Sequence, residues 1–439
     1  MVKAATKPKK LEQWIWYGFI AIAIGLPFHA FIITYLGSFA PSSLTTLFRY
    51  WKELILIGMA SATVALLLND AAMRKRLLSD RFAWLLSFFT LIHIVIILNF
   101  KTAIFAGVLG LKINLAFLVL YLILSLTQLY TKITVTELLK LVLIPAGITG
   151  CIGVLQAFVL PHDILTHFGY GPFGGPNPAY YLIENSHTIR IMSTLWGPNQ
   201  FGSYLIFPIT LSLWWFFATS GRKKIFAAAI FLIDILALYG TQSRGAWLAT
   251  IIGIIIVIML LTKGLVRFII TGISVLGLTG IIVLAANHKL PSSFDVILLH
   301  GVPAQGNTGF ISSNEGHLRA LTLGYDKLKT HPFGSGLEAA GRASEGTNDQ
   351  LYTENFYLQL AVQIGYFGLA TFLSIIILIV IRLWGTIKQD PIATALLASL
   401  IGLSINNLFA HTWSDGATAW IWWGIAGIVM ARKTHKQHA

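Results

Sequence analysis

Long apolar segments recur along the whole chain and are separated by shorter polar connections. Each segment is about 20 residues long, which is enough for a helix to cross the hydrocarbon core of a bilayer. We therefore expect an all-α, polytopic membrane protein with about twelve transmembrane helices. The expected spans are 14–36, 52–69, 83–100, 103–127, 138–160, 196–218, 225–240, 245–262, 267–287, 354–382, 391–410 and 416–431. No polar linker divides the chain, so residues 1–439 are expected to form one transmembrane domain.

Two connections are too long to be simple turns. Residues 161–195 are rich in Gly, Pro and aromatic side chains, and residues 288–353 form a still longer polar segment. Long connections in compact proteins are usually functional or disordered. The second segment contains GHLRALTLGYDKLKTHP, in which apolar residues recur at helical spacing. We expect a large outer loop, partly helical, that covers the bundle like a lid.

The composition agrees with a membrane protein, since 56% of the residues are hydrophobic and 11% are charged. Soluble domains carry roughly 25% charged residues. The net charge of +14 does not indicate a nucleic-acid partner, because most of the excess lies in short loops between spans. About 20 of the 31 Lys and Arg residues lie on the side of the two termini. The termini are therefore expected in the cytoplasm and the two long segments outside. The single Cys151 excludes an internal disulfide.

Three arginines lie in polar positions near the outer ends of spans. Arg244 follows Gln242 in YGTQSRGAWLAT, and Arg190 stands in TIRIMSTLWGPNQFGSYL. Arg319 lies in the larger outer segment. Each of them has an ordinary explanation, either snorkelling to lipid headgroups or a solvated charge on a loop helix. A guanidinium is also a planar, permanently charged group that binds phosphate oxygens well.

Glu354 is the carboxylate with the most unusual position. It is the second residue of TENFYLQLAVQIGYFGLA, where a polar loop turns into an apolar run. One explanation is structural: Thr353 caps the span, and a Glu near a helix N-terminus favours the helix dipole. The functional explanation is that the carboxylate accepts a proton from a sugar hydroxyl. Other candidates for substrate contacts at this end of the spans are Asn355, Gln359, His411 and Asp415.

No motif for a metal ion or a cofactor is present in the sequence. DxD, HExxH and paired-Cys patterns are missing, so we expect neither a metal nor a cofactor. Without a metal, a site that stabilises a diphosphate needs arginines. Lys112 and Asp234 lie inside expected spans, and each needs a partner that the sequence does not identify.

Together these motifs resemble those of bacterial O-antigen ligases and O-antigen polymerases. The resemblance rests on residues 241–249, 318–337 and 353–370, with a weaker match at 190–205. It implies a GT-C-like membrane glycosyltransferase on the outer face of the cytoplasmic (inner) membrane. The donor would be a glycan on polyprenyl diphosphate, and the acceptor a glycan or glycolipid. Arg244 and Arg319 match the two arginines that hold the diphosphate, whereas the family's His-Asn is here Glu354-Asn355.

The resemblance implies a metal-independent, inverting displacement at the sugar C1. Glu354 would deprotonate the acceptor hydroxyl, while Arg244 and Arg319, with Arg190, would offset the charge on the leaving diphosphate. The Glu in place of His favours a polymerase, which joins two lipid-linked glycans. A ligase, which moves the glycan to lipid A core or another acceptor, remains an alternative. A flippase or transporter of lipid-linked oligosaccharide is an alternative of a different class.

Overall fold

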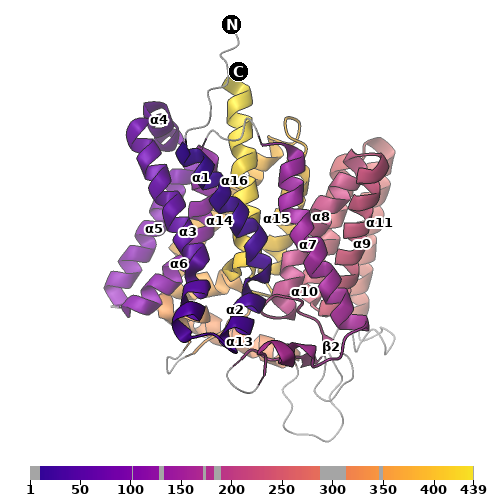
Figure 1. The fold of residues 1–439 in the computed structure, drawn as a ribbon, viewed down its shortest axis with the longest axis horizontal. Helices are drawn as coiled ribbons and strands as arrows, with labels where there is room; N and C mark the ends of the chain where they lie inside the picture. The colour runs from indigo at the N-terminus through magenta and orange to yellow at the C-terminus, as the bar shows by residue number, and fades with distance from the viewer. Residues whose placement is uncertain are drawn as a thin grey trace, which may run out of the picture.

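Helices make up almost the whole structure. The computed structural model describes residues 10–100, 102–127, 133–171, 175–181, 189–286, 313–345 and 350–438 (Figure 1). The first half contains α1 (Lys10–Gly25), η1 (Leu26–Phe28), α2 (His29–Gly37), α3 (Ser42–Asn69), α4 (Ala71–Ser79), α5 (Arg81–Phe100), α6 (Ile104–Leu126), α7 (Val135–Phe158), η3 (Ile164–Phe168), β1 (Tyr180–Tyr181) and β2 (Ile189–Arg190). The second half contains α8 (Pro198–Ala218), α9 (Gly221–Thr241), α10 (Arg244–Leu261), α11 (Gly264–Ala286), α13 (Ser313–Thr330), η4 (Leu337–Ala339), η5 (Gly341–Ser344), α14 (Phe356–Trp384), α15 (Ala393–Asn406), η6 (Thr412–Ser414) and α16 (Gly416–His438). The all-α class is confirmed.

The helix bounds follow the expected spans closely. Each expected range coincides with one helix or, at the N-terminal end, with the consecutive pair α1 and α2. Among the described residues, nine helical segments are long and apolar enough to cross a membrane, and α15 is a shorter apolar helix. The structure therefore supports a multi-pass membrane protein, while the count of twelve stays a prediction.

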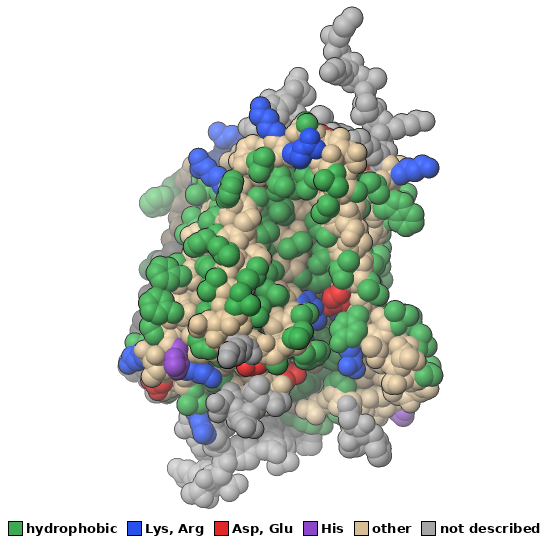
Figure 2. Space-filling view, turned by 90° about the vertical axis from the view of Figure 1, so that its left-hand side faces the viewer, with side chains coloured by type: hydrophobic (Ala, Val, Ile, Leu, Met, Phe, Trp, Pro, Cys, Tyr) green, Lys and Arg blue, Asp and Glu red, His purple; other side chains and the backbone are tan. Residues whose placement is uncertain are grey.

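The two ends of the bundle differ in their elements. The beginning of α1 and the end of α16 lie at the same end, beside α4, whereas α13 lies across the opposite end (Figure 1). We call the latter the α13 end. Figure 2 shows Lys and Arg side chains around the α4 end and a broad hydrophobic flank below it. This pattern is the one expected for a bundle whose flank faces lipid.

The two long connections are described only in part. Residues 172–174 and 182–188 of the first, and 288–312 and 346–349 of the second, lie outside the described residues. In the first connection, β1 pairs antiparallel with β2. The described part of the second contains α13, η4 and η5, in agreement with a partly helical segment. The extent of the outer loop as a whole stays a prediction.

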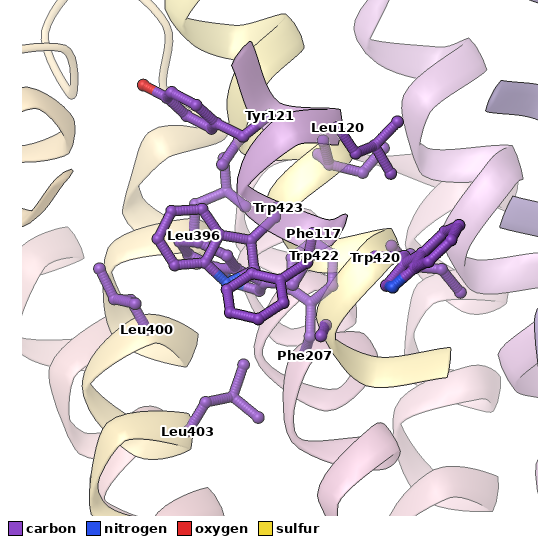
Figure 3. Packing of buried hydrophobic residues seen from close by; sticks show 14 of the residues in the cluster. Phe117, Leu120, Tyr121, Phe207, Leu396, Leu400, Leu403, Trp420, Trp422 and Trp423 are labelled. Carbon is purple, nitrogen blue, oxygen red and sulfur yellow. The ribbon is translucent and has the colours of Figure 1, made fainter. Parts of the chain in front are cut away.

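Aromatic side chains of α16 pack against α6 and α15 in the middle of the bundle (Figure 3). The Trp423 ring centroid lies 5.2 Å from that of Trp422 and 5.7 Å from that of Tyr121. The Trp422 indole also donates to the Ser399 hydroxyl at 2.9 Å. A Cβ at Gly427 would lie 2.7 Å from the Tyr121 carbonyl oxygen, so only glycine permits this approach of α16 to α6. Close packing of this kind holds membrane helices together where burial of apolar surface does not.

The helix α14 is broken at Gly365, which has φ 73° and ψ −179°. The loop after α13 fills the break. The backbone N–H of Ser335 donates to the Val362 carbonyl at 2.8 Å, and that of Tyr366 donates to the Pro332 carbonyl at 3.0 Å. Backbone groups that leave a helix inside a membrane protein must find such partners. The break therefore docks the loop that follows α13.

Replacing Gly365 with Ala should destabilise the protein. Its backbone conformation is nearly restricted to glycine, and a Cβ there would overlap the backbone of Phe333. A residue forced into such a region costs about 1–3 kcal/mol, before the overlap is counted. Thermal unfolding of the purified protein in detergent should show a lower midpoint for Gly365→Ala. The control is Gly58→Ala in α3, where no atom lies within 4 Å of the added Cβ. An equal midpoint for the two variants would contradict this account of the break.

Candidate functional site

Two adjoining cavities open at the α13 end. The first, which we call the carboxylate cavity, has a volume of about 260 Å³. The second, which we call the arginine cavity, has a volume of about 500 Å³. The carboxylate cavity is lined by Asn199, Gln200, Ser203, His317, Arg342, Tyr352, Glu354, Gln359, Phe409, Ala410, His411, Thr412, Ser414 and Asp415. The two share Asn199, His317, Glu354, Phe409 and Ala410, so Glu354 stands at their common wall.

Arg190 and Arg244 both line the arginine cavity. The Arg190 Nε donates to the Thr241 carbonyl oxygen at 3.1 Å, and its Nη2 donates to the Asn199 Oδ1 at 2.7 Å. Burial and, to a lesser extent, the positive charge of Arg244 lower the pKa of Arg190 to about 10. Two guanidinium groups close enough for one to lower the pKa of the other form a natural site for an anion.

The start of α10 contributes to the same cavity. Gln242 ends α9 with φ 53°, a left-handed conformation, and its backbone N–H donates to the Tyr239 carbonyl at 3.1 Å. This sharp turn lets α10 begin at Arg244, and Ser243, Arg244 and Gly245 all line the cavity. A helix N-terminus carries roughly half a positive charge and exposes unpaired N–H groups. The arginine cavity therefore combines two guanidinium groups with a helix N-terminus.

Glu354 lies outside the helix that the sequence placed it in. The helix α14 begins at Phe356, and its N-cap is Asn355, whose Oδ1 accepts from the Leu358 N–H at 2.9 Å. The expectation that Thr353 caps this helix is wrong: the Thr353 hydroxyl donates to the Asn355 carbonyl oxygen at 2.9 Å. Glu354 itself has φ 49°. The left-handed turn directs its carboxylate into the cavities rather than onto the helix end.

The partner of Glu354 is His317 of α13, whose Nδ1 contacts the Glu354 Oε2 and forms an ion pair with it when the imidazole is protonated. Both side chains remain accessible, at 44% for Glu354 and 35% for His317, and both line the two cavities. Sequence reasoning left His317 unassigned. Its spacing to Leu321, four residues later on the same helix face, was visible in the sequence, but nothing indicated that this face meets Glu354.

Two asparagines at the end of α15 hold the cavity walls together. The Asn406 Nδ2 donates to the Ser203 hydroxyl of α8 at 2.7 Å and to the Thr412 hydroxyl at 2.9 Å. The backbone carbonyl of Asn407 accepts from the Phe356 N–H at 2.9 Å, and the side-chain Oδ1 of Asn407 accepts from the Trp413 N–H at 3.2 Å. Both side chains are buried. They tie together α8, the start of α14 and the turn before α16, a role that the sequence did not reveal.

The remaining candidates Gln359, His411 and Asp415 all line the carboxylate cavity. Gln359 is buried. Burial lowers the pKa of His411 to about 4 despite the nearby Glu354, so its imidazole is neutral at neutral pH. Asp415 precedes α16 and accepts from the Thr418 hydroxyl at 2.9 Å. Burial raises the pKa of Asp415, and this hydrogen bond opposes the rise.

Arg319 lies apart from the other two arginines. Its side chain is exposed on α13, and it lines neither the carboxylate cavity nor the arginine cavity. Arg342 of η5, which the sequence did not single out, lines the carboxylate cavity instead. Across the described residues, no three His, Cys, Asp or Glu side chains are grouped as ligands for a metal ion.

A comparison with known families matches the part of the chain that contains Arg244, His317 and Glu354. Residues 227–373 match the model of the O-antigen ligase family. This range contains Arg244, His317, Arg319 and Glu354, whereas Arg190 lies before it. A search of curated proteins gave no match. The three motifs at 241–249, 318–337 and 353–370 all fall within the matched range, and the match supports the assignment of the chain to the O-antigen ligase and polymerase family.

Proposed function

We propose that the protein is a membrane glycosyltransferase that moves a glycan from polyprenyl diphosphate to a sugar hydroxyl. The observation that carries this proposal is the position of Glu354, at the wall shared by the arginine cavity and the carboxylate cavity. A base between an anion site and a polar cavity can take a proton from an acceptor in one while the donor's leaving group lies in the other. The family match supports the same chemistry.

The arginine cavity suits the donor. Arg190 and Arg244 bring two positive charges to it, and α10 adds its N-terminus. The same cavity is lined by four apolar side chains, Leu248, Leu318, Leu321 and Leu408. A diphosphate attached to a polyprenyl chain needs both kinds of surface next to each other. Arg319, which is exposed on α13, contributes less in this arrangement than the sequence motif implies.

The reaction follows from this placement. The acceptor hydroxyl loses its proton to the Glu354 carboxylate, and the oxygen attacks C1 of the donor sugar from the side opposite the diphosphate. The bond between C1 and the diphosphate oxygen breaks, and its electron pair leaves with the diphosphate. Arg190 and Arg244 stabilise the charge that develops there. His317 holds the carboxylate in position through the ion pair. The product has inverted configuration at C1.

The α13 end faces the outside of the cytoplasmic membrane in this proposal, and the α4 end faces the cytoplasm. The support is the excess of Lys and Arg that the sequence has on the side of the termini, whereas Figure 2 shows Lys and Arg side chains at both ends of the face it draws. An outer active site agrees with a donor that has already been carried across the membrane. The finer picture of about twelve spans in a GT-C-like bundle belongs to the same proposal.

The polymerase is the version of the function that we favour over the ligase. The carboxylate at position 354 replaces the histidine of the family's motif, and an imidazole comes instead from α13, through His317. This departure from the ligase pattern sets the chain apart from enzymes that use the motif histidine.

Reconstitution tests the proposal directly. Purified protein in liposomes, supplied with polyprenyl-diphosphate oligosaccharide from its own host and no other acceptor, should produce a ladder of lengthened glycans on a gel. Transfer that requires a second, chemically different acceptor would make the protein a ligase. If neither product forms and the lipid-linked sugar instead changes leaflet, the enzyme proposal is overturned in favour of a transporter.

The variant Glu354→Gln should lose at least about 100-fold in transfer rate, because general-base catalysis of this kind contributes that much. Binding of the lipid-linked donor should stay nearly unchanged. His317→Gln should cost less, about tenfold, because His317 positions the base. Glu338→Gln is the control, since Glu338 lies in the same segment but lines neither cavity. If His317→Gln is as damaging as Glu354→Gln, the imidazole takes the proton and the carboxylate orients it.

Substitution of either Arg190 or Arg244 with Gln should reduce kcat/KM for the donor by about 100–1000-fold, because each removes a donor to the leaving diphosphate. Arg319→Gln is the comparison and should cost about tenfold or less, since its side chain is exposed outside the cavity. Steady-state transfer rates over a range of donor concentrations measure all three. Equal losses for Arg319→Gln and Arg190→Gln would place Arg319 in the diphosphate site.

A further inference from the structure

A third cavity adjoins the carboxylate cavity on the side away from Arg190 and Arg244. It has a volume of about 410 Å³ and shares Arg342, Ser414 and Asp415 with the carboxylate cavity. Its basic lining residues come from α3, α6 and η5: Arg49, Lys52, Lys112 and Arg342. We call it the lysine cavity. Three carboxylates, those of Glu53, Glu345 and Asp415, also line it, so its four Lys and Arg side chains exceed the acidic ones by one.

The two lysines share one carboxylate. The Glu53 Oε1 lies 3.3 Å from the Lys52 Nζ and 3.1 Å from the Lys112 Nζ. Lys52 uses its other donors within the wall, because its Nζ contacts the Arg49 carbonyl oxygen at 3.1 Å and the His29 Nε2 at 3.0 Å. Lys112 forms an ion pair with Glu53, and an ammonium has three donors. Lys52 and Glu53 therefore position Lys112, which has donors to offer a ligand.

The two arginines add further positive charge to the wall. Within the described part of the chain, no carboxylate lies at ion-pair distance from the guanidinium of Arg49 or Arg342. The Arg342 guanidinium lies 5.8 Å from the centroid of the Trp196 ring, which also lines the cavity. Arg342 reaches both the lysine cavity and the carboxylate cavity. The wall thus presents two guanidinium groups and one ammonium to a ligand, together with the carboxylates of Glu345 and Asp415.

The position of Lys112 points to a lipid-linked ligand. Lys112 lies eight residues after Ile104, the first residue of α6, which is about 12 Å along the helix axis. The cavity is also lined by Phe105 and Leu109 of the same helix, and the Phe105 side chain is 72% exposed. Figure 2, which looks at the flank with α3, α5 and α6, shows basic and acidic side chains next to each other within hydrophobic surface. Charged side chains at such a depth usually mark a ligand site.

We propose that the lysine cavity binds the diphosphate of the acceptor, a second lipid-linked glycan, while its sugar end extends into the carboxylate cavity. Lys112, Arg49 and Arg342 contact the phosphate oxygens, and the lipid chain leaves along Phe105 on the flank of α6. The inference rests on the proposed function and makes it more specific, since a site for a second diphosphate distinguishes polymerisation from transfer to an acceptor without one.

Binding of undecaprenyl diphosphate, without any glycan, tests the assignment. Native mass spectrometry of the protein from phosphatidylcholine nanodiscs should show two bound diphosphates for the wild type. The variant R49Q/K112Q and the variant R190Q/R244Q should each bind one, and the combination of all four should bind none. The affinity of the lost site should fall by about 10–100-fold, as expected for charged hydrogen bonds. The conservative variant K112R should keep two.

The control is K75Q on α4, where the lysine is exposed, and it should bind two. Two equal sites in R49Q/K112Q, or a single site in the wild type, would overturn the acceptor site and leave the donor proposal intact. A wild type that binds two diphosphates but transfers no glycan in liposomes would instead refute the proposed function. Inorganic diphosphate should compete at least about 100-fold less well than the lipid, because the lipid chain contributes apolar contact. Equal competition would assign the cavity to a water-borne phosphorylated acceptor and overturn the lipid-linked one.

Discussion

The buried pair Asn406 and Asn407 at the end of α15 is the interaction on which the arrangement of the α13 end depends. Hydrogen bonds of these two residues connect the end of α15 to α8, to the start of α14 and to the turn before α16. Each helix N-terminus carries roughly half a positive charge, so gathering several of them is electrostatically unfavourable. The Asn406 and Asn407 side chains bear no charge, and the start of α14 is bonded by the Asn407 backbone carbonyl, so these contacts bring no further charge to the site. The positive potential of the site is therefore preserved by the contacts that assemble it.

Within this positive potential, the Glu354 carboxylate has an unusual position. A glutamate one position before an N-cap would ordinarily satisfy the backbone or the dipole of its own helix. Asn355 already takes the cap, and the left-handed backbone at position 354 turns the carboxylate away from α14. A positive φ at a residue other than glycine costs of order 1–3 kcal/mol and persists where the surroundings impose it. The left-handed backbone at Glu354 and the contact with His317 thus keep the carboxylate in the cavities, and the N-terminus of α14 does not bind it.

The sequence predicted the helices well because length and apolar content alone decide whether a segment spans a bilayer, and the bounds of α5, α8 and α10 lie within a few residues of their expected ranges. It also identified Glu354 and Arg244 as residues at the outer ends of spans. It missed His317 and Arg342, because both reach the cavities through the docking of loops that are distant in sequence. For the same reason, the sequence motifs assigned Arg319 to the diphosphate site together with Arg244. In the structure, the turn at Gln242 and the strand β2 bring Arg190 close to Arg244 instead.

The break in α14 explains how these distant loops are positioned. Gln363, one turn after Gln359 on the same helix, donates through its Nε2 to the carbonyls of Leu337 and Ala340 at 2.9 and 2.7 Å. Its Oε1 accepts from the Asn114 Nδ2 of α6 at 3.0 Å. The segment between α13 and η5 is therefore fixed to the helix that begins just after Glu354. A single helix, α14, consequently fixes the position of two parts of the site. The Glu354 carboxylate lies at its start, and the loop that follows α13 docks at its break.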